Sequence, residues 1–342
     1  MITRLFTAAD PASAAACGKL LREGELVAFP TETVYGLGGS VWNEKAVAEI
    51  FRVKGRPADN PLIAHIAKVG DLGQVVRDVP RAAEALFRAF SPGPLTVVLP
   101  KTARVPDIVT AGGGTVAVRI PSHPAARAII EAAGVPVVAP SANLSGRPSP
   151  TDFETTKRDL DGKVAAILDG GACSVGVEST VVLPEGDTRV RILRPGAITP
   201  EMLKRIVPEV VVDDNCLRPL TDGAPVLSPG MKHRHYAPRA PLTIVTGARE
   251  KVLAFLREKA KDKTTGILCF EGELTGENVV CYGRESDAAS QSRALFRALR
   301  AFDDMPVARI YARAPSEDGM GLAVANRLLR AAEFTVLEVD GS

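Results

Sequence analysis

The sequence predicts an α/β protein built from two domains, and three observations carry this prediction. Short apolar runs of strand length alternate with amphipathic segments of helix length through the first 212 residues. Residues 213–241 are rich in Pro and Gly and have no sustained period, which is typical of a linker. From residue 242 the order strand, helix, strand, strand, helix, strand, helix is that of a small parallel, doubly wound domain. We therefore predict a first domain over residues 1–212, a linker over 213–241 and a second domain over 242–342.

The first elements are bounded by residues that begin or end helices. A helix is predicted over Pro11–Glu23, because Asp10 can cap its start and Gly24 interrupts it. A strand at Leu26–Phe29 then leads into the polar, glycine-containing segment TETVYGLGG, residues 31–39, which we predict to be a loop.

The next helix has an equally clear start and end. Asn43 can cap it, and Val47, Ile50 and Phe51 form its apolar stripe. Gly55 should end it, because glycine is the usual residue just past a helix. The other predicted elements of the first domain are strands at Pro61–Ala67, Leu95–Leu99, Thr115–Ile120 and Val135–Pro140, helices at Arg81–Phe90 and Pro124–Ala133, and strands near Ala165–Leu168, Val177–Leu183 and Val190–Arg194.

Polar side chains follow two of these elements, where they can face a ligand. Thr31, Glu32, Thr33 and Tyr35 lie in the first loop. Lys54, Arg56 and Asn60 lie after the second helix. A Lys and an Arg that flank a Gly, beside a proline that fixes the backbone, can bind a polyanion such as a triphosphate.

The segment TVAVRI places Arg119 on the side of a strand opposite its apolar face. Val116, Val118 and Ile120 alternate with Thr115, Ala117 and Arg119. This pattern fits a solvent-exposed arginine on an edge strand as well as an arginine that faces a ligand. Gly112–Gly114, just upstream, could form a mobile flap, which would favour the ligand-facing alternative.

Three other polar positions leave alternatives open. His65 shares a strand face with Ile63, so the pattern favours a satisfied, partly buried histidine over a ligand contact. The segment SANLSGRPSP, residues 141–150, fits a plain turn or a set of donors for a nucleotide. Ser179 falls in the more apolar row of its strand, where its hydroxyl could serve structure or substrate.

The linker and the second domain carry fewer signals. The linker contains the basic and aromatic cluster KHRHY, Lys232 to Tyr236, which suggests contact with something anionic, although a solvated charged linker is the alternative. The second domain has neither GxGxxG nor a P-loop, so we predict no cofactor there and a role in packing and in holding the linker. Its predicted strands are 242–247, 266–270, 278–282 and 308–312, and its predicted helices are Arg249–Lys259, Asp287–Phe302 and Leu322–Glu333.

Composition excludes several classes of protein. A net charge of +2 provides no global field for nucleic acid, so RNA could contact only a local patch. The five cysteines are widely spaced and never form CxxC, which indicates reduced thiols in the cytoplasm. The sequence has no signal-peptide core and no membrane-spanning window. Because it also lacks GxSxG, HExxH and any metal-ligand cluster, we expect chemistry based on positioning and charge neutralisation, such as adenylation.

Two long motifs identify a family. PTETVYGLG at residues 30–38, followed by KGRPADNPL at residues 54–62, resembles the signature of the YrdC family. The C-terminal region makes the chain similar to the two-domain form of that family. The resemblance implies a twisted mixed sheet with flanking helices in the first domain and a Rossmann-like second domain. It implies a linker that covers the active site.

The resemblance also implies an activity, substrates and partners. L-threonine and bicarbonate or CO2 would give a threonyl carbamate, which attacks ATP to form L-threonylcarbamoyl-AMP and pyrophosphate. Mg2+ would be held mainly by the ATP phosphates, with no metal-binding residues on the protein. Downstream transfer proteins would use the product to modify adenosine 37 of tRNA, and weak contact with tRNA is expected.

The family's site residues carry over onto this sequence by position. L-threonine would be held by Thr33, His65, Arg119 and Ser179, with Arg119 on its carboxylate. Lys54 and Arg56 would be the catalytic residues. ATP would be held by Lys54, Arg56, Asn60, Thr115, Ser141, Asn143, Ser149, Arg194 and Tyr236. Two alternatives stay open: an enzyme that forms a carbamoyl adenylate from carbamoyl phosphate, as in hydrogenase maturation factors, and an RNA-binding module.

Overall fold

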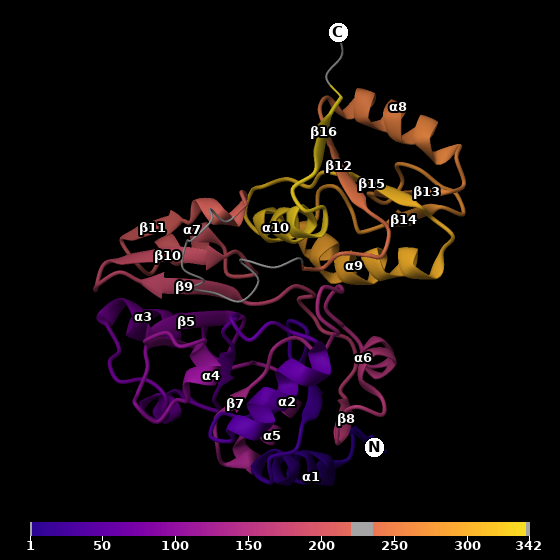
Figure 1. Cartoon of the computed structure of the whole chain (residues 1–342). Helices are drawn as coiled ribbons and strands as arrows, with labels where there is room; N and C mark the ends of the chain where they lie inside the picture. Colours follow the sequence, from indigo (N-terminus) through magenta and orange to yellow (C-terminus); the bar gives the residue numbers. More distant parts are fainter. Residues whose placement is uncertain (1, 220–234, 340–342) are drawn as a thin grey trace. The chain divides into compact units, whose positions relative to one another are not determined.

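The computed structural model describes residues 2–219 and 235–339. Its contacts divide the chain into two compact units. Residues 2–145 and 149–216 belong to the first unit. The second unit holds Gly146–Pro148, Leu217–Pro219 and the described residues from 235 onward. The predicted two-domain α/β class is thereby confirmed (Figure 1).

The first unit is built on a mixed sheet of eleven strands. The sheet contains both parallel pairs, such as β4 and β6, and antiparallel pairs, such as β5 and β6, as the family resemblance implied. In spatial order the strands are β1 (Arg4–Thr7), β8 (Ala166–Asp169), β2 (Val27–Pro30), β3 (Tyr35–Ser40), β7 (Val137–Val138), β4 (Ile63–His65), β6 (Thr115–Arg119), β5 (Leu95–Pro100), β9 (Thr180–Pro184), β10 (Arg189–Arg194) and β11 (Glu209–Val212).

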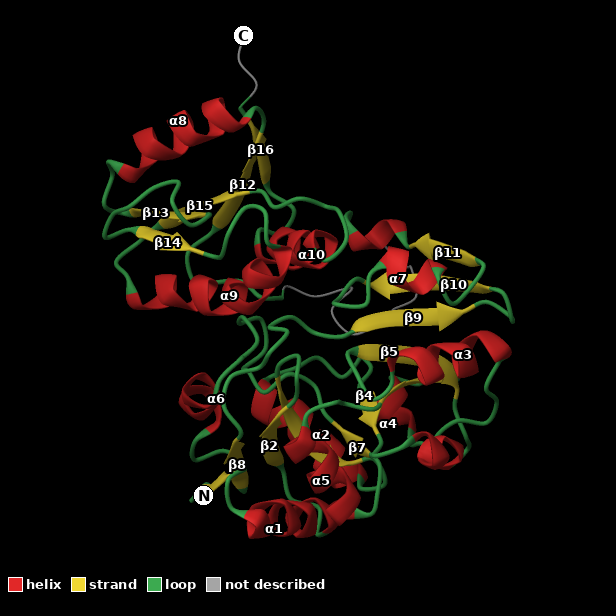
Figure 2. Ribbon diagram, turned by 180° about the vertical axis from the view of Figure 1, so that it is seen from behind, coloured by secondary structure: helices red, strands yellow, loops and turns green. Residues whose placement is uncertain are grey.

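Two helices of the first unit have the capping residues that the sequence predicts, and α4, α6 and α7 are additional. The Asp10 side chain accepts from the Ala12 N–H, the Asn43 side chain accepts from the Ala46 N–H, and Gly55 ends its helix at φ 62°. The helices are α1 (Pro11–Arg22), α2 (Glu44–Lys54), α3 (Arg81–Phe90), α4 (Asp107–Thr110), α5 (Pro124–Ala133), α6 (Phe153–Leu160) and α7 (Pro200–Lys204), with short 3-10 turns at Val69–Gln74 and Asp214–Cys216. Figure 2 shows α1 and α5 packed side by side.

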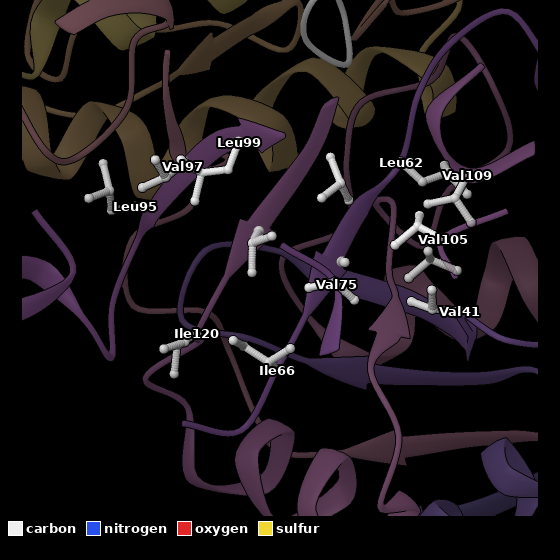
Figure 3. Packing of buried hydrophobic residues seen from close by; sticks show 14 of the residues in the cluster. Val41, Leu62, Ile66, Val75, Leu95, Val97, Leu99, Val105, Val109 and Ile120 are labelled. Carbon is white, nitrogen blue, oxygen red and sulfur yellow. The ribbon is translucent and has the colours of Figure 1, made fainter. Parts of the chain in front are cut away.

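The largest core of the first unit lies on one side of this sheet. Leu95, Val97 and Leu99 of β5 point into it together with Ile120, which follows β6 (Figure 3). The alternate residues of the same strands, including Thr96 and Arg119, point to the opposite face because successive side chains of a strand alternate. A smaller apolar cluster that includes Val98 and Ala117 also lies on that opposite face, beside the polar residues described below.

The predicted TETVYGLGG loop is wrong in its second half. Residues 35–40 form β3, which pairs antiparallel with β2, so only residues 31–34 turn the chain. The glycines serve close packing instead of loop flexibility. A Cβ on Gly38 would lie 2.6 Å from the Phe29 ring, and one on Gly39 would lie 3.0 Å from Ile50 Cδ1. Tyr35 is fully buried in this strand, and its hydroxyl donates to the Gly171 carbonyl at 2.8 Å.

The second unit contains a parallel sheet of five strands in the order β14 (Val279–Cys281), β13 (Thr265–Cys269), β15 (Arg309–Arg313), β12 (Leu242–Thr246) and β16 (Val336–Glu338). Its helices are α8 (Arg249–Ala260), α9 (Ala288–Ala301) and α10 (Gly321–Ala331), with a 3-10 turn at Phe302–Asp304. Figure 1 shows α8 on one side of this sheet and α9 and α10 on the other. The predicted doubly wound class is confirmed, and β16 is an additional strand.

Candidate active site

A row of polar side chains crosses the centre of the first sheet. His65 of β4 is in register with Arg119 of β6, and Arg119 is in register with Thr96 of β5. Side chains in register on neighbouring strands share a face, so the three lie side by side. All three are at least 96% buried. A buried polar row of this kind requires hydrogen-bond or charge partners.

Arg119 is neither exposed nor on an edge strand, so the edge-strand alternative is wrong. β6 lies between β4 and β5, and Arg119 retains only 4% of its accessible surface. Its Nη2 lies 2.8 Å from Glu32 Oε1, and its Nε donates to the Gly93 carbonyl at 3.4 Å. Glu32 Oε2 also accepts from the Ser122 N–H at 3.1 Å. The alternation of TVAVRI located the face of Arg119 correctly but could not reveal which strands lie beside it.

Glu32, which contacts this row, and His65 within it have well-defined protonation states. Burial raises the pKa of Glu32, but the charge and the close contact of Arg119, followed by backbone N–H groups including that of Ser122, outweigh burial and hold the pKa below its usual value. Burial and the nearby Arg119 charge lower the pKa of His65 to about 3. At neutral pH Arg119 is therefore a cation, Glu32 is a carboxylate and His65 is a neutral imidazole. His65 is more completely buried than predicted, and its Nδ1 lies 3.1 Å from the Ile63 carbonyl oxygen.

The other two residues predicted to bind L-threonine, Ser179 and Thr33, lie next to this row. The Ser179 hydroxyl is 2.7 Å from the Thr96 hydroxyl and accepts from Arg194 Nη2 at 3.1 Å. Ser179 precedes β9 instead of lying on it, because the strand begins at residue 180. Thr33 is fully buried beside Glu32, and its hydroxyl lies 2.8 Å from the Thr31 hydroxyl. The structure thus places the four residues predicted to bind L-threonine close to one another.

Several of the predicted ATP residues form a second group around Lys54. The buried Lys54 ammonium, at the end of α2, donates to the carbonyls of Ser141 and Asn143, at 2.6 Å for Asn143. The Lys54 carbonyl accepts from the Ser145 N–H at 2.8 Å. Lys54 therefore fixes the first half of the SANLSGRPSP segment, which a plain turn does not require.

Arg56 and Asn60 form a third group, and Thr115 lies on β6. Arg56 Nη2 donates to the Pro61 carbonyl at 3.2 Å. Asn60 is 1% exposed, and among the described residues neither atom of its side-chain amide has a hydrogen-bond partner. Thr115 begins β6, at the far end of this strand from Arg119 and roughly 13 Å away along it. An amide buried without partners is costly, which indicates a polar ligand at this position.

The last predicted ATP residues have separate environments. The Ser149 hydroxyl donates to the Glu178 carboxylate at 2.5 Å, and Glu178 adjoins Ser179 in the chain. Tyr236 belongs to the second unit, where its ring stacks on Phe296 at 5.1 Å. Lys232, His233 and Arg234 of the KHRHY cluster lie outside the described residues. The predicted role of that cluster stays a prediction.

Comparison with known proteins places the chain in a family. The family model described as telomere recombination, which covers Sua5, YciO and YrdC proteins, matches residues 19–196. The model described as the C-terminal domain of threonylcarbamoyl-AMP synthase matches residues 198–333. The chain belongs to the Sua5/YciO/YrdC family.

Relatives in the Sua5/YciO/YrdC family match nearly the whole chain. A Bacillus subtilis protein named threonylcarbamoyl-AMP synthase is 44% identical, over 98% of this chain and 97% of its own length. A Pyrococcus abyssi protein of the same name is 43% identical, over 93% of this chain and 94% of its own length. The crystal structure of P. abyssi Sua5 complexed with L-threonine matches with a TM-score of 0.92 and 40% identity, over 99% of this chain and the whole of that one.

Sequence reasoning missed two members of the site. Thr96 was overlooked, although the pattern LTVVL puts it on the face opposite Leu95 and Val97. Glu32 was noticed as a loop residue but received no role, because its partner Arg119 is distant in sequence. Among the described residues no three His, Cys, Asp or Glu side chains form a metal-binding group. No helix in the described ranges is long and apolar enough to cross a membrane.

Proposed function

We infer that the protein is an L-threonylcarbamoyl-AMP synthase. The observation that carries this function is the full-length similarity, at 38–44% identity, to proteins of that name from a bacterium, an archaeon and a yeast. The enzyme is an adenylyl transferase: L-threonine and bicarbonate or CO2 give the carbamate of the threonine nitrogen. A carbamate oxygen then attacks the α-phosphorus of ATP, and pyrophosphate leaves. This product serves tRNA modification.

L-threonine would bind along the polar row. Arg119 is suited to its carboxylate because a guanidinium offers five N–H donors, more than Gly93 and Glu32 engage. His65, Ser179 and Thr33 supply neutral hydrogen-bonding groups around it. Because these side chains are buried and held by their neighbours, the nitrogen of threonine would be presented to CO2 in a fixed orientation, which lowers the entropic cost of reaction.

ATP would bind through the Lys54 and Arg56 groups. Both cations are at least 92% buried, so their interaction with phosphate would be only weakly screened by solvent. They would stabilise the charge that accumulates on the departing pyrophosphate, which is the main demand of phosphoryl chemistry. Asn60, Thr115, Ser141, Asn143, Ser149 and Arg194 would supply the remaining contacts. Mg2+ would enter with ATP, bound by phosphate oxygens and water, and would neutralise phosphate charge.

We also propose roles for the linker and for downstream proteins, and a cellular location. Tyr236 would contact ATP from the linker, and the linker would cover the active site. Downstream transfer proteins would take up the adenylate and modify adenosine 37 of tRNA, with weak tRNA contact by this chain. All five cysteines are free, which suits the reducing cytoplasm that we propose as its location.

Pyrophosphate release tests this function. The full chain is incubated with ATP and Mg2+, and L-threonine and bicarbonate are each supplied or omitted. We expect release only when both are present. Release that ignores threonine but responds to carbamoyl phosphate would indicate the carbamoyl-adenylate alternative. Salt-sensitive RNA binding without ATP turnover would indicate an RNA-binding module.

A further inference from the structure

Glu32 is a buried carboxylate in the threonine site without an assigned role. It is 6% exposed and lies in the turn between β2 and β3. Its position is fixed at two points: Oε2 accepts from the Ser122 N–H, and the Glu32 carbonyl accepts from the Val175 N–H at 2.8 Å. A carboxylate held in the interior costs stability unless a complete set of partners offsets its desolvation, so an incomplete set indicates a function.

The contact between Glu32 and Arg119 leaves hydrogen-bonding capacity on both sides. Nη2 and Oε1 are 2.8 Å apart, so the two charges are paired. Within the described part of the chain, however, neither of these two buried atoms has a well-aligned hydrogen bond. Nη2 carries two N–H groups and Oε1 has more than one lone pair, so this one contact does not use their full hydrogen-bonding capacity.

The net charge of this group decides which ligands it accepts. Three other titratable side chains feel the Glu32 carboxylate: His65, His123 and Cys173. Burial lowers the pKa values of both histidines and raises that of the Cys173 thiol, so all three are neutral at pH 7. Of these five groups only Arg119 and Glu32 are charged, and they sum to zero.

The adjacent Arg119 and Glu32 charges match the two ends of a zwitterion, while the Arg194 guanidinium contacts Ser179 beside them. The carboxylate of an amino acid would meet Arg119, and its ammonium group would meet Glu32. A carboxylic acid without the amine would bring an uncompensated negative charge next to a buried carboxylate, which is strongly unfavourable at low dielectric. We propose that Glu32 is a specificity-determining residue that, together with Arg119, makes this pocket select a zwitterionic amino acid over a simple carboxylate.

This inference rests on the proposed binding of the threonine carboxylate by Arg119. The test therefore compares two ligands that share that carboxylate. L-threonine carries the amine, and (R)-3-hydroxybutanoate carries hydrogen in its place with the same hydroxyl. Binding of each to the full-length protein is measured by calorimetry without ATP, for the wild type and for Glu32→Gln.

Glu32→Gln should move the two affinities in opposite directions. We expect L-threonine to bind at least about ten-fold more weakly, and 3-hydroxybutanoate at least about ten-fold more tightly, because the variant site gains one net positive charge. The matched control is Glu273→Gln, which neutralises a buried carboxylate paired with Arg313 at 3.4 Å in the second unit. It should change neither affinity. ATP binding serves as the test that each variant is folded.

Two results separate the possible failures. Failure of the wild type to bind threonine would overturn the proposed function itself. If the wild type binds threonine, and the affinities for both ligands change in the same direction or not at all in Glu32→Gln, only the role of Glu32 is overturned.

If Glu32→Gln does not fold, the wild type is titrated with L-threonine, 3-hydroxybutanoate and threoninol, which has the amine but no carboxylate. Weak binding of both singly charged ligands supports selection of the zwitterion, and binding of 3-hydroxybutanoate within about three-fold of threonine refutes it.

Discussion

Each unit of the protein contains a buried pair of Arg and Glu, and the two pairs differ in how completely they are satisfied. In the second unit Glu273 accepts from the Phe270 N–H at 3.1 Å and contacts Arg313, whose Nη2 also donates to Glu285 at 2.8 Å. In the first unit the Arg119–Glu32 contact lacks an aligned hydrogen bond within the described residues. A satisfied pair serves structure, whereas an incompletely satisfied pair indicates a place for a ligand.

The surroundings of the two pairs reinforce this distinction. Arg119 lies in register with a neutral histidine and a threonine, next to further hydroxyl groups. Arg313 lies over the Phe270 ring at 5.6 Å and beside Arg249 and Glu285, which are half exposed to solvent. The chemistry of the neighbours, more than the ion pair itself, marks the first unit as the reactive one.

Removal of Arg119 should produce the largest effect. Arg119→Ala deletes the donors for the threonine carboxylate and leaves Glu32 buried without its counter-charge. We expect threonine affinity to fall about 100-fold, while ATP affinity stays nearly unchanged. Calorimetry with each substrate measures both values, and Arg313→Ala is the control. Equal losses for the two substrates would mean that Arg119 contacts phosphate.

Separating the units should have the next largest effect. A fragment of residues 1–212 retains the first sheet through β11 and should fold, but it lacks Tyr236. We expect its rate of pyrophosphate release to be at least about ten-fold below that of the full chain, because the proposed contact of Tyr236 with ATP is lost. Circular dichroism verifies that the fragment is folded. Full activity of a folded fragment would exclude any role of the linker in the reaction.

Acid should destabilise the first unit through His65. Its pKa is about 3 in the folded state, whereas an unperturbed histidine has a pKa of 6.5, so unfolding takes up a proton between these values. The stabilisation is fully present above pH 6.5 and is lost as the pH falls toward 3; it should decrease by about 2 kcal/mol at pH 5. The depressed pKa of Glu32 acts in the same direction at lower pH. Urea unfolding at several pH values, compared with His65→Asn, measures the effect; an unchanged pH dependence in the variant would contradict it.

Substitution of Asn60 should have the smallest effect. It should raise the free energy of unfolding, whereas most substitutions lower it. Its amide is buried without hydrogen-bond partners in the described residues, so Asn60→Ala removes an unsatisfied polar group. Without ATP, the free energy of unfolding should rise by about 1 kcal/mol, while ATP affinity falls. Urea denaturation and calorimetry measure the two quantities. A loss of stability together with unchanged ATP affinity would make Asn60 a structural residue.

Local signals predicted much of the fold. Asn43 and Gly55 located α2, and the bounds of α3 and α5 follow from their apolar periodicity and their flanking residues, because capping and amphipathicity depend on residues within a few turns. The register of His65 with Arg119, and the pairing of Arg119 with Glu32, could not be predicted in this way. They join segments about 54 and 87 residues apart in the chain, and a strand pattern does not reveal its neighbours.

Glycine was the most misleading local signal. In TETVYGLGG it suggested a flexible loop, whereas Gly38 and Gly39 permit close contact with Phe29 and Ile50 inside a strand. The roles carried over from the family stay predictions; the structure places several of these residues near Arg119 or Lys54. Glu32 was noticed in the first loop but received no role, because the sequence does not show that Arg119 lies beside it.

Direct detection of the product tests the central proposal. The full chain is incubated with ATP, Mg2+, L-threonine and isotopically labelled bicarbonate, and the adenylates formed are analysed by mass spectrometry. We predict L-threonylcarbamoyl-AMP that carries the label in its carbamoyl carbon, formed only when threonine and bicarbonate are both present and lost in Arg119→Ala. An adenylate that lacks the threonyl group, or one that forms without bicarbonate, would contradict it.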